Sequence, residues 1–145
     1  MLKKITLSLT FAASCLFAGE TYTMQSIEGN TYTFEITDSN EVVLKTNNSP
    51  SYQEVVLEFF GTRCGPCKAM APSLNEKYQN GEVKVIALET QYSSPEAISK
   101  FKNETGVSYP IIATEERTPQ VFLNELYNRG IFKGYVPFVI NLKEL

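Results

Sequence analysis

The sequence contains no histidine, no tryptophan and only 3 cysteines among 145 residues. The absence of histidine excludes Ser-His-Asp and Cys-His catalysis, zinc sites built on histidine and haem ligation by histidine. The chemistry that is left must come from cysteine, carboxylates, lysine or tyrosine.

The sequence also lacks an excess of basic residues. Asp and Glu total 16 against 13 for Lys and Arg, and the net charge of −3 argues against a nucleic-acid-binding protein. Hydrophobic residues make up 43% of the chain, which is ordinary for a globular protein and too apolar for a disordered one. The length suits one compact domain.

The first apolar run, Ile5–Ala18, is shorter than the ~20 residues that a membrane-spanning helix needs. It follows Lys3 and Lys4, and this order is typical of a secretory signal peptide. We therefore predict that residues 1–18 are a signal peptide; an uncleaved N-terminal anchor and lipidation at Cys15 are the alternatives. Export places the protein in the periplasm or at the extracytoplasmic face of the membrane, where disulfides persist.

Local patterns predict a β-rich beginning followed by alternating strands and helices. Residues 19–50 alternate apolar and polar side chains between turn signals, and we predict that they form an N-terminal β-hairpin extension. Residues 51–145 alternate strands with helices, which predicts an α/β domain with helices layered on a sheet. The predicted strands of this domain are Val55–Phe60, Val83–Leu88, Tyr109–Thr114 and Val136–Asn141.

Capping signals delimit three predicted helices. The first helix runs from about Cys64 to Gln79, and Pro72 inside it should kink it. The two later helices are marked by a capping hydroxyl, a first-turn proline and a terminal glycine: Ser94, Pro95 and Gly106 for one, and Thr118, Pro119 and Gly130 for the other.

Two cysteines, Cys64 and Cys67, lie at the junction of the strand Val55–Phe60 and the first helix. At a helix N-terminus, unpaired N–H groups and the helix dipole favour the thiolate of Cys64, which is the nucleophile of disulfide exchange. Cys67, one turn further on, can then attack a mixed disulfide on Cys64. Half of a zinc site is excluded, because no histidine and no further mature cysteine can complete it, so we predict no metal. A structural disulfide is the alternative, although a bridge across two residues constrains little chain.

The segment from Val56 to Pro72, with Cys-Gly-Pro-Cys between a strand and a helix, resembles the thioredoxin superfamily. Together with the secreted setting, it resembles the exported TlpA/ResA-like branch. The resemblance covers residues 50–141 and implies a thioredoxin-like three-layer α/β fold. Pro72 falls where the family has its helix-kinking proline.

The resemblance also implies a cis-proline that faces the cysteines. Pro137, which follows Val136, occupies that place in the sequence, and Tyr109–Pro110 is the competing candidate. A cis X–Pro bond is a minority state that folds keep for geometric reasons. In the family, this loop offers its backbone for pairing with an extended substrate.

A proton relay is implied as well. Glu58 lies six residues before Cys64, where thioredoxins bear a buried acid beneath the second cysteine. A buried carboxyl has a raised pKa and can relay a proton to or from Cys67. The alternative is that strand alternation turns Glu58 toward solvent.

Arg63 departs from the family, which usually has tryptophan before the first cysteine. The substitution removes a flat apolar contact and adds a guanidinium, which would lower the pKa of Cys64 further and favour an acidic partner. A solvated side chain without consequence is the alternative.

The family continues after the cis-proline with another antiparallel strand and a last helix, whereas only residues 138–145 follow Pro137 here. We therefore expect an abbreviated C-terminus, with an open sheet edge and exposed apolar side chains on one face.

The resemblance predicts an exported thiol–disulfide oxidoreductase that needs no cofactor. The Gly-Pro pair between the cysteines resembles reducing thioredoxins more than strong oxidants such as DsbA, which implies reduction of protein disulfides. A membrane thiol donor would supply the electrons, and cytochrome c maturation is the implied setting. The alternatives are a thioredoxin-like protein-binding module, a truncated and poorly active protein, and peroxide reduction. Peroxide reduction comes last because the peroxiredoxin-type Pro and Thr before the nucleophile are missing.

Overall fold

The structure is a computed structural model that describes residues 19–46 and 54–145. The predicted signal peptide, with Cys15, lies outside the described residues, as does the predicted boundary between extension and domain. The elements in chain order are β1 (Glu20–Gln25), β2 (Thr31–Ile36), β3 (Val42–Lys45), β4 (Val55–Phe60), α1 (Gly65–Gln79), β5 (Lys84–Glu89), α2 (Pro95–Thr105), β6 (Ile111–Ile112), α3 (Arg117–Asn128), β7 (Phe138–Asn141) and β8 (Lys143–Glu144). No helix in these two ranges is long and apolar enough to cross a membrane.

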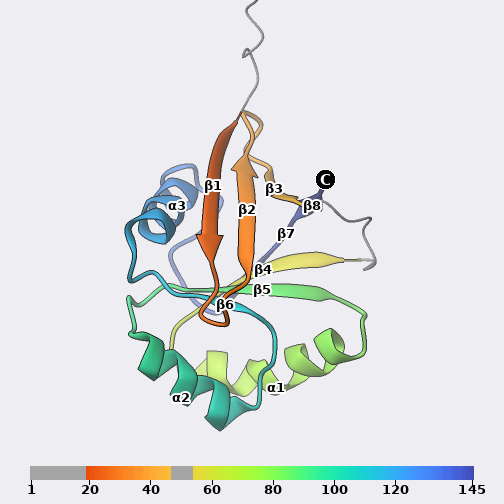
Figure 1. Cartoon of the computed structure of the whole chain (residues 1–145), viewed down its shortest axis with the longest axis vertical. Helices are drawn as coiled ribbons and strands as arrows, with labels where there is room; N and C mark the ends of the chain where they lie inside the picture. Colours follow the sequence, from red (N-terminus) through yellow and green to blue (C-terminus); the bar gives the residue numbers. More distant parts are fainter. Residues whose placement is uncertain (1–18, 47–53) are drawn as a thin grey trace, which may run out of the picture.

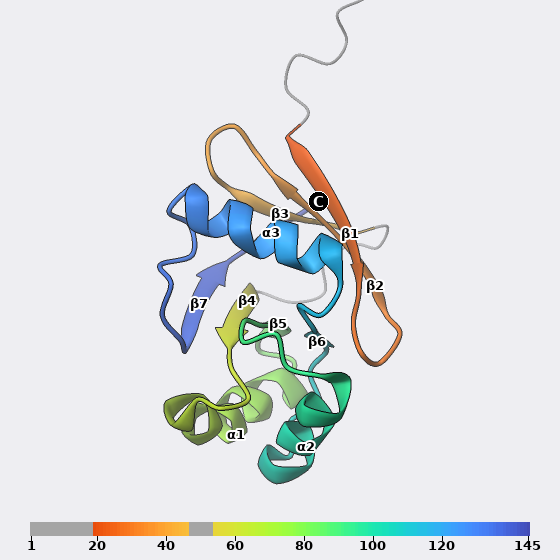
Figure 2. The ribbon, with the colours of Figure 1, turned by 90° about the vertical axis from the view of Figure 1, so that its left-hand side faces the viewer.

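The central sheet has the strand order β6-β5-β4-β7. Strands β4, β5 and β6 are parallel, and β7 runs antiparallel to β4. Helices α1 and α2 cover one face of this sheet, while α3 and the N-terminal strands lie on the other side (Figures 1 and 2). All six residues of β4 are buried, as its continuous apolar sequence predicts for a strand covered on both faces. The predicted α/β domain, with helices layered on a sheet, is thereby confirmed.

The N-terminal strands form a second sheet of order β1-β2-β3-β8. Buried and exposed side chains alternate along β1. The buried ones, Tyr22 and Met24, join Leu57, Phe59 and Phe122 in one apolar core. The extension therefore shares its core with the central sheet. Strand β8, which the sequence did not predict, pairs parallel with β3.

A second apolar core fills the space between the central sheet and helices α1 and α2. Both cysteines belong to it, with Val56 and Phe60 of β4 and Phe101 of α2. The rings of Phe60 and Phe101 lie 4.8 Å apart, centroid to centroid. The cysteines are therefore attached to a packed layer rather than to a mobile loop.

Helix α2 begins and ends at the predicted capping residues. The Ser94 hydroxyl accepts a hydrogen bond from the N–H of Ala97 at 3.2 Å, Pro95 is the first helical residue, and Gly106 ends the helix with a φ of 75°. The predicted start of α3 at Thr118 is wrong. The helix begins at Arg117 with Glu116 as its cap residue, so that Pro119 lies within the first turn, where proline is tolerated.

Two predicted strands are shorter than expected. The strand predicted over residues 109–114 is reduced to the two residues of β6. At its start, Pro110 has no N–H to donate to a neighbouring strand. On its outer side, the carbonyl of Ile111 accepts from the N–H of Ile27 at 2.8 Å. The strand predicted over residues 136–141 begins at Phe138, after Val136 and Pro137.

Strand β7 is one edge of the central sheet in the described part of the chain. Val139 on this strand is 40% exposed, and Phe138 and Ile140 are partly buried against the first core. The ring of Tyr135, just before the strand, contacts Phe138 and is 60% exposed.

Candidate active site

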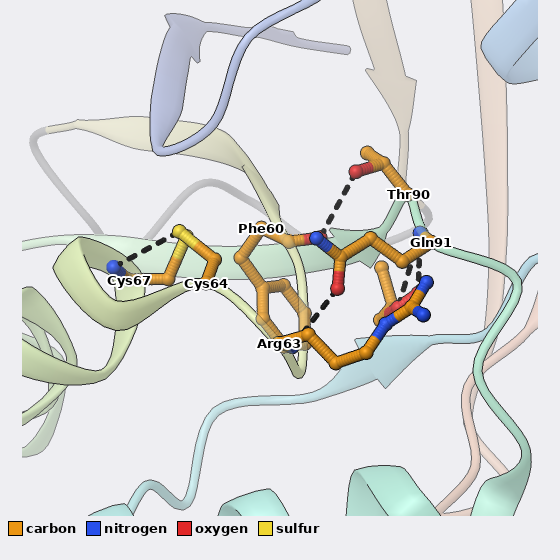
Figure 3. The surroundings of a disulfide bond; sticks show 7 residues. Phe60, Arg63, Cys64, Cys67, Thr90 and Gln91 are labelled. Atoms are coloured by element: carbon orange, nitrogen blue, oxygen red, sulfur yellow. Dashed lines mark hydrogen bonds between the residues drawn. A yellow bond between two sulfur atoms is a disulfide. The ribbon is translucent and has the colours of Figure 1, made fainter.

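Helix α1 carries both cysteines at its N-terminal end, where a disulfide bond joins them (Figure 3). Cys64 is the N-cap residue, and its sulfur accepts a hydrogen bond from the N–H of Cys67 at 3.2 Å. At a helix N-terminus, an N–H group in this position can also donate to a thiolate. Cys64 is 8% exposed and Cys67 is fully buried. Cys64 is therefore the more accessible of the two cysteines.

The turn before Cys64 is held by the loop that follows β5. The N–H of Arg63 donates to Oε1 of Gln91 at 2.9 Å, and the hydroxyls of Thr62 and Ser93 are 2.6 Å apart (Figure 3 shows the Gln91 contact). Gly61 lies against the same Gln91 side chain, so closely that a Cβ there would be 2.2 Å from it. The turn can take this path because residue 61 has no side chain.

Glu89, at the end of β5, organises this loop and was missed by the sequence analysis. Its carboxylate is buried and accepts from the N–H groups of Gln91 at 2.5 Å and Ser93 at 3.2 Å. Burial raises the pKa of Glu89, and these two N–H groups and the Arg63 charge offset part of that rise. An acid at the end of a buried strand is the sequence signal that could have identified it.

The Arg63 side chain runs away from the cysteines, toward Gln91 (Figure 3). Its positive charge acts on the buried carboxylate of Glu89. The guanidinium therefore has a partner other than the Cys64 sulfur, and its predicted effect on the pKa of Cys64 stays a prediction.

Glu58 lies in the layer that contains the cysteines. The register of β4 places it between Val56 and Phe60, which both belong to the core beneath α1, and its side chain is 1% exposed. Burial raises the pKa of Glu58 to about 7, and the hydroxyl of Tyr109 lowers it in part. A carboxyl that titrates near neutral pH can take up and release a proton under working conditions.

The Val136–Pro137 peptide bond is cis. Val136 packs against both apolar cores, including the one that contains Cys64 and Cys67. The loop before β7 therefore contacts the layer in which the disulfide lies.

The described residues include no group of three or more Cys, His, Asp or Glu side chains that could hold a metal ion. The buried titratable groups of this region are Glu58 and Tyr109, in the layer of the disulfide, and Glu89 at the end of β5. This set suits sulfur exchange and proton transfer.

A family profile described as the AhpC/TSA family matches residues 26–122, which is more than half of the chain and includes both cysteines and Glu58. Among curated proteins, the chain is 37% identical over 60 residues to the thiol-disulfide oxidoreductase ResA of Bacillus anthracis, covering 39% of this chain and 34% of ResA. It is 32% identical over 84 residues to the chloroplastic Thioredoxin Y1 of Arabidopsis thaliana, covering 57% of this chain and 44% of the relative. The matches thus span less than half of the length of these relatives.

Solved structures share the fold at low sequence identity. A secreted Mycobacterium tuberculosis disulfide oxidoreductase homologous to E. coli DsbE superposes with a TM-score of 0.55 at 17% identity, covering 84% of this chain and 75% of that one. StoA from Bacillus subtilis gives a TM-score of 0.54 at 18% identity, covering 84% and 80%. The resemblance to the thioredoxin superfamily and its TlpA/ResA-like branch is confirmed.

Proposed function

We propose, from the premise that this chain belongs to the AhpC/TSA family, that it is a thiol–disulfide oxidoreductase acting on protein disulfides through Cys64 and Cys67. One observation carries the proposal. The disulfide joins a helix-capping cysteine that is 8% exposed to a fully buried cysteine, in the same layer as a buried carboxyl. Neither a structural bridge nor a binding surface requires that combination of groups.

The exchange proceeds in two balanced steps. In the reduced protein, the Cys64 thiolate attacks one sulfur of a substrate disulfide; a mixed disulfide forms, and the other substrate sulfur leaves as a thiolate and takes a proton from water. Cys67 then loses its proton and attacks the Cys64 sulfur, which closes the Cys64–Cys67 bond and releases the second substrate thiolate. The substrate disulfide gains two electrons and the protein dithiol loses them.

Glu58 is the base of the second step in this proposal. A buried thiol is a weak acid, because burial disfavours its charged form. The Glu58 carboxylate takes the proton of Cys67 and later passes it to solvent, and a pKa of about 7 allows both transfers. The peptide groups of Val136 and Pro137 would pair with the extended backbone of the substrate beside Cys64.

The direction and setting follow from the family resemblance and from the predicted signal peptide. We propose that the protein works outside the cytoplasm, where it reduces disulfides with electrons from a membrane thiol donor. Cytochrome c maturation, in which haem-site cysteines must be kept reduced, is the process we assign to it. The reduction potential should be nearer to the roughly −270 mV of thioredoxin than to the roughly −120 mV of DsbA.

The function is tested by reduction of insulin disulfides and by trapping. The wild-type protein should reduce insulin with dithiothreitol as donor, and Cys67→Ser should accumulate as a covalent adduct that reducing agents dissolve. Cys64→Ser, the matched control, should form no adduct. If Cys67→Ser retains function and neither variant traps a partner, the protein is a binding module. Rapid turnover of hydrogen peroxide in place of disulfides would assign it to peroxide reduction.

A further inference from the structure

Two polar groups are buried between the central sheet and helix α1 without a hydrogen-bond partner. Among the described residues, Oε2 of Glu58 and the hydroxyl of Tyr109 are such atoms, and each side chain is 1% exposed. The two groups nevertheless act on each other electrostatically. An unpaired buried polar atom costs free energy, so two of them that face each other beside a disulfide need a reason.

The sheet register brings Tyr109 to Glu58. Glu58 of β4 is paired with Ala87 of β5, and the N–H of Ala87 donates to the carbonyl of Pro110 at 2.9 Å. Tyr109, the residue before Pro110, belongs to the same apolar core as Ala87, and Ala87 carries only a methyl group.

Helix α1 fixes the segment that carries Tyr109. Asn75 donates from Nδ2 to the carbonyl of Gly106 at 3.2 Å and accepts at Oδ1 from the N–H of Ser108 at 2.8 Å. The ring of Tyr78 meets that of Tyr109 edge-on at 6.1 Å. The helix that begins with the cysteines therefore also fixes the position of Tyr109 relative to the disulfide.

Few other titratable groups in the described part of the chain face Glu58. Helix α1 contributes Cys67 to the same layer, and the residue of β7 opposite Glu58 is Val139, which does not titrate. Glu89 of β5 is on the same face of the sheet, but it lies two residue pairs further along, opposite Phe60, and its carboxylate is bound by backbone N–H groups. Tyr109 is thus the side chain that acts on the charge of Glu58.

We propose that Tyr109 is a positioning residue for the second step of exchange: its hydroxyl donates a hydrogen bond to the ionised carboxylate of Glu58 and keeps that carboxylate available to take the Cys67 proton. This inference rests on the proposed function. The hydroxyl and the carboxyl already act on each other in the structure, and the hydrogen bond between them strengthens when the carboxyl ionises, as catalytic hydrogen bonds often tighten only during reaction.

The proton balance is complete within these groups. The carboxylate takes one proton from the thiol of Cys67 as Cys67 attacks Cys64, and no further electrons are exchanged. The hydroxyl of Tyr109 keeps its own proton throughout, because burial and the neighbouring carboxylate hold its pKa far above neutrality. Its effect is to stabilise the charged form of Glu58 relative to the neutral one.

The test follows the reaction of the reduced protein with one equivalent of Ellman's reagent in a stopped-flow instrument. The first release of thionitrobenzoate reports attack by Cys64, and the second reports closure of the disulfide by Cys67. In the wild-type protein the second phase should rise with pH about a midpoint near 7, the pKa of Glu58. In Tyr109→Phe this midpoint should move up by roughly one to two pH units, which slows the second phase about 5- to 50-fold at pH 7.

Tyr22→Phe is the matched control, since Tyr22 belongs to the other apolar core and its hydroxyl donates to the carboxylate of Glu20 at 2.5 Å. Tyr22→Phe should leave both phases unchanged. Glu58→Gln should abolish the pH dependence of the second phase, whereas Tyr109→Phe should only shift its midpoint. If Tyr109→Phe keeps the wild-type midpoint, the inference is wrong while the proposed function stands. If the wild-type protein shows no second phase, the proposed function itself fails.

A measurement on the wild-type protein covers the case in which the variant does not fold. The ¹³C resonances of the Glu58 carboxyl and of the Tyr109 ring carbon that bears the hydroxyl should titrate with one shared midpoint. A Tyr109 resonance that ignores the Glu58 titration would overturn the proposal.

Discussion

Replacing the buried carboxyl of Glu58 by an amide should change how the stability of the oxidised protein depends on pH. The folded protein raises the pKa of Glu58 from 4.5 to about 7, because the side chain is buried. Below pH 4.5 the carboxyl is protonated in both folded and unfolded chains and favours neither. Between about pH 4.5 and 7 the unfolded chain ionises first, so the folded state loses stability as the pH rises. Above pH 7 the loss is complete.

The size of this loss follows from the shift. At about 1.4 kcal/mol per pH unit, the change from 4.5 to about 7 corresponds to about 3 kcal/mol. This is a large part of the 5–15 kcal/mol that typically separates folded from unfolded domains. Glu58→Gln keeps the shape of the side chain and cannot ionise, so the variant should lack this loss and should exceed the wild-type stability at pH 8.

Urea unfolding of the oxidised protein at several pH values from 4 to 8 measures the effect. The difference in unfolding free energy between variant and wild type should grow by about 3 kcal/mol between the two ends of this range. A constant difference would refute the claim that Glu58 is buried as a neutral acid. It would also remove the reason for assigning it the proton of Cys67.

Two further predictions concern the active-site turn and the N-terminal hairpin. Gly61→Ala should displace the Gln91 side chain and lower the unfolding free energy by about 1–3 kcal/mol, measured by urea titration, whereas Gly65→Ala, where a Cβ meets nothing within 4 Å, should cost almost nothing. The pKa of Glu28 shifts in the opposite direction to that of Glu58. Partial burial raises it, but the Lys102 ammonium and backbone N–H groups outweigh burial and lower it. The Glu28 carboxylate therefore stabilises the fold at neutral pH, and this stabilisation is lost in acid. Glu28→Gln should therefore reduce stability at pH 7 and converge on the wild type near pH 3; a difference that persists at pH 3 would contradict this assignment.

Local sequence signals predicted the features of this protein that depend on neighbours in the chain. Helix α2 starts and ends where Ser94, Pro95 and Gly106 place it, because a capping hydroxyl and a left-handed glycine act within one turn. The cap by Cys64 has the same local origin, and it brings both cysteines to one helix end. The buried character of β4 was also readable, since an unbroken apolar run has no polar face to offer to solvent.

The rest depends on contacts between residues that are distant in sequence, and no local pattern encodes them. The sequence suggested a buried Glu58, but only the packing of β4 under α1 decided that it shares a layer with Cys67. Tyr109 meets Glu58 because two strands and a helix place it there, and Glu89 holds the active-site turn through a loop more than twenty residues away along the chain. The sequence by itself determined which sulfur caps the helix. The tertiary structure decided which buried groups control the protons, because a pKa depends on what surrounds a side chain in space.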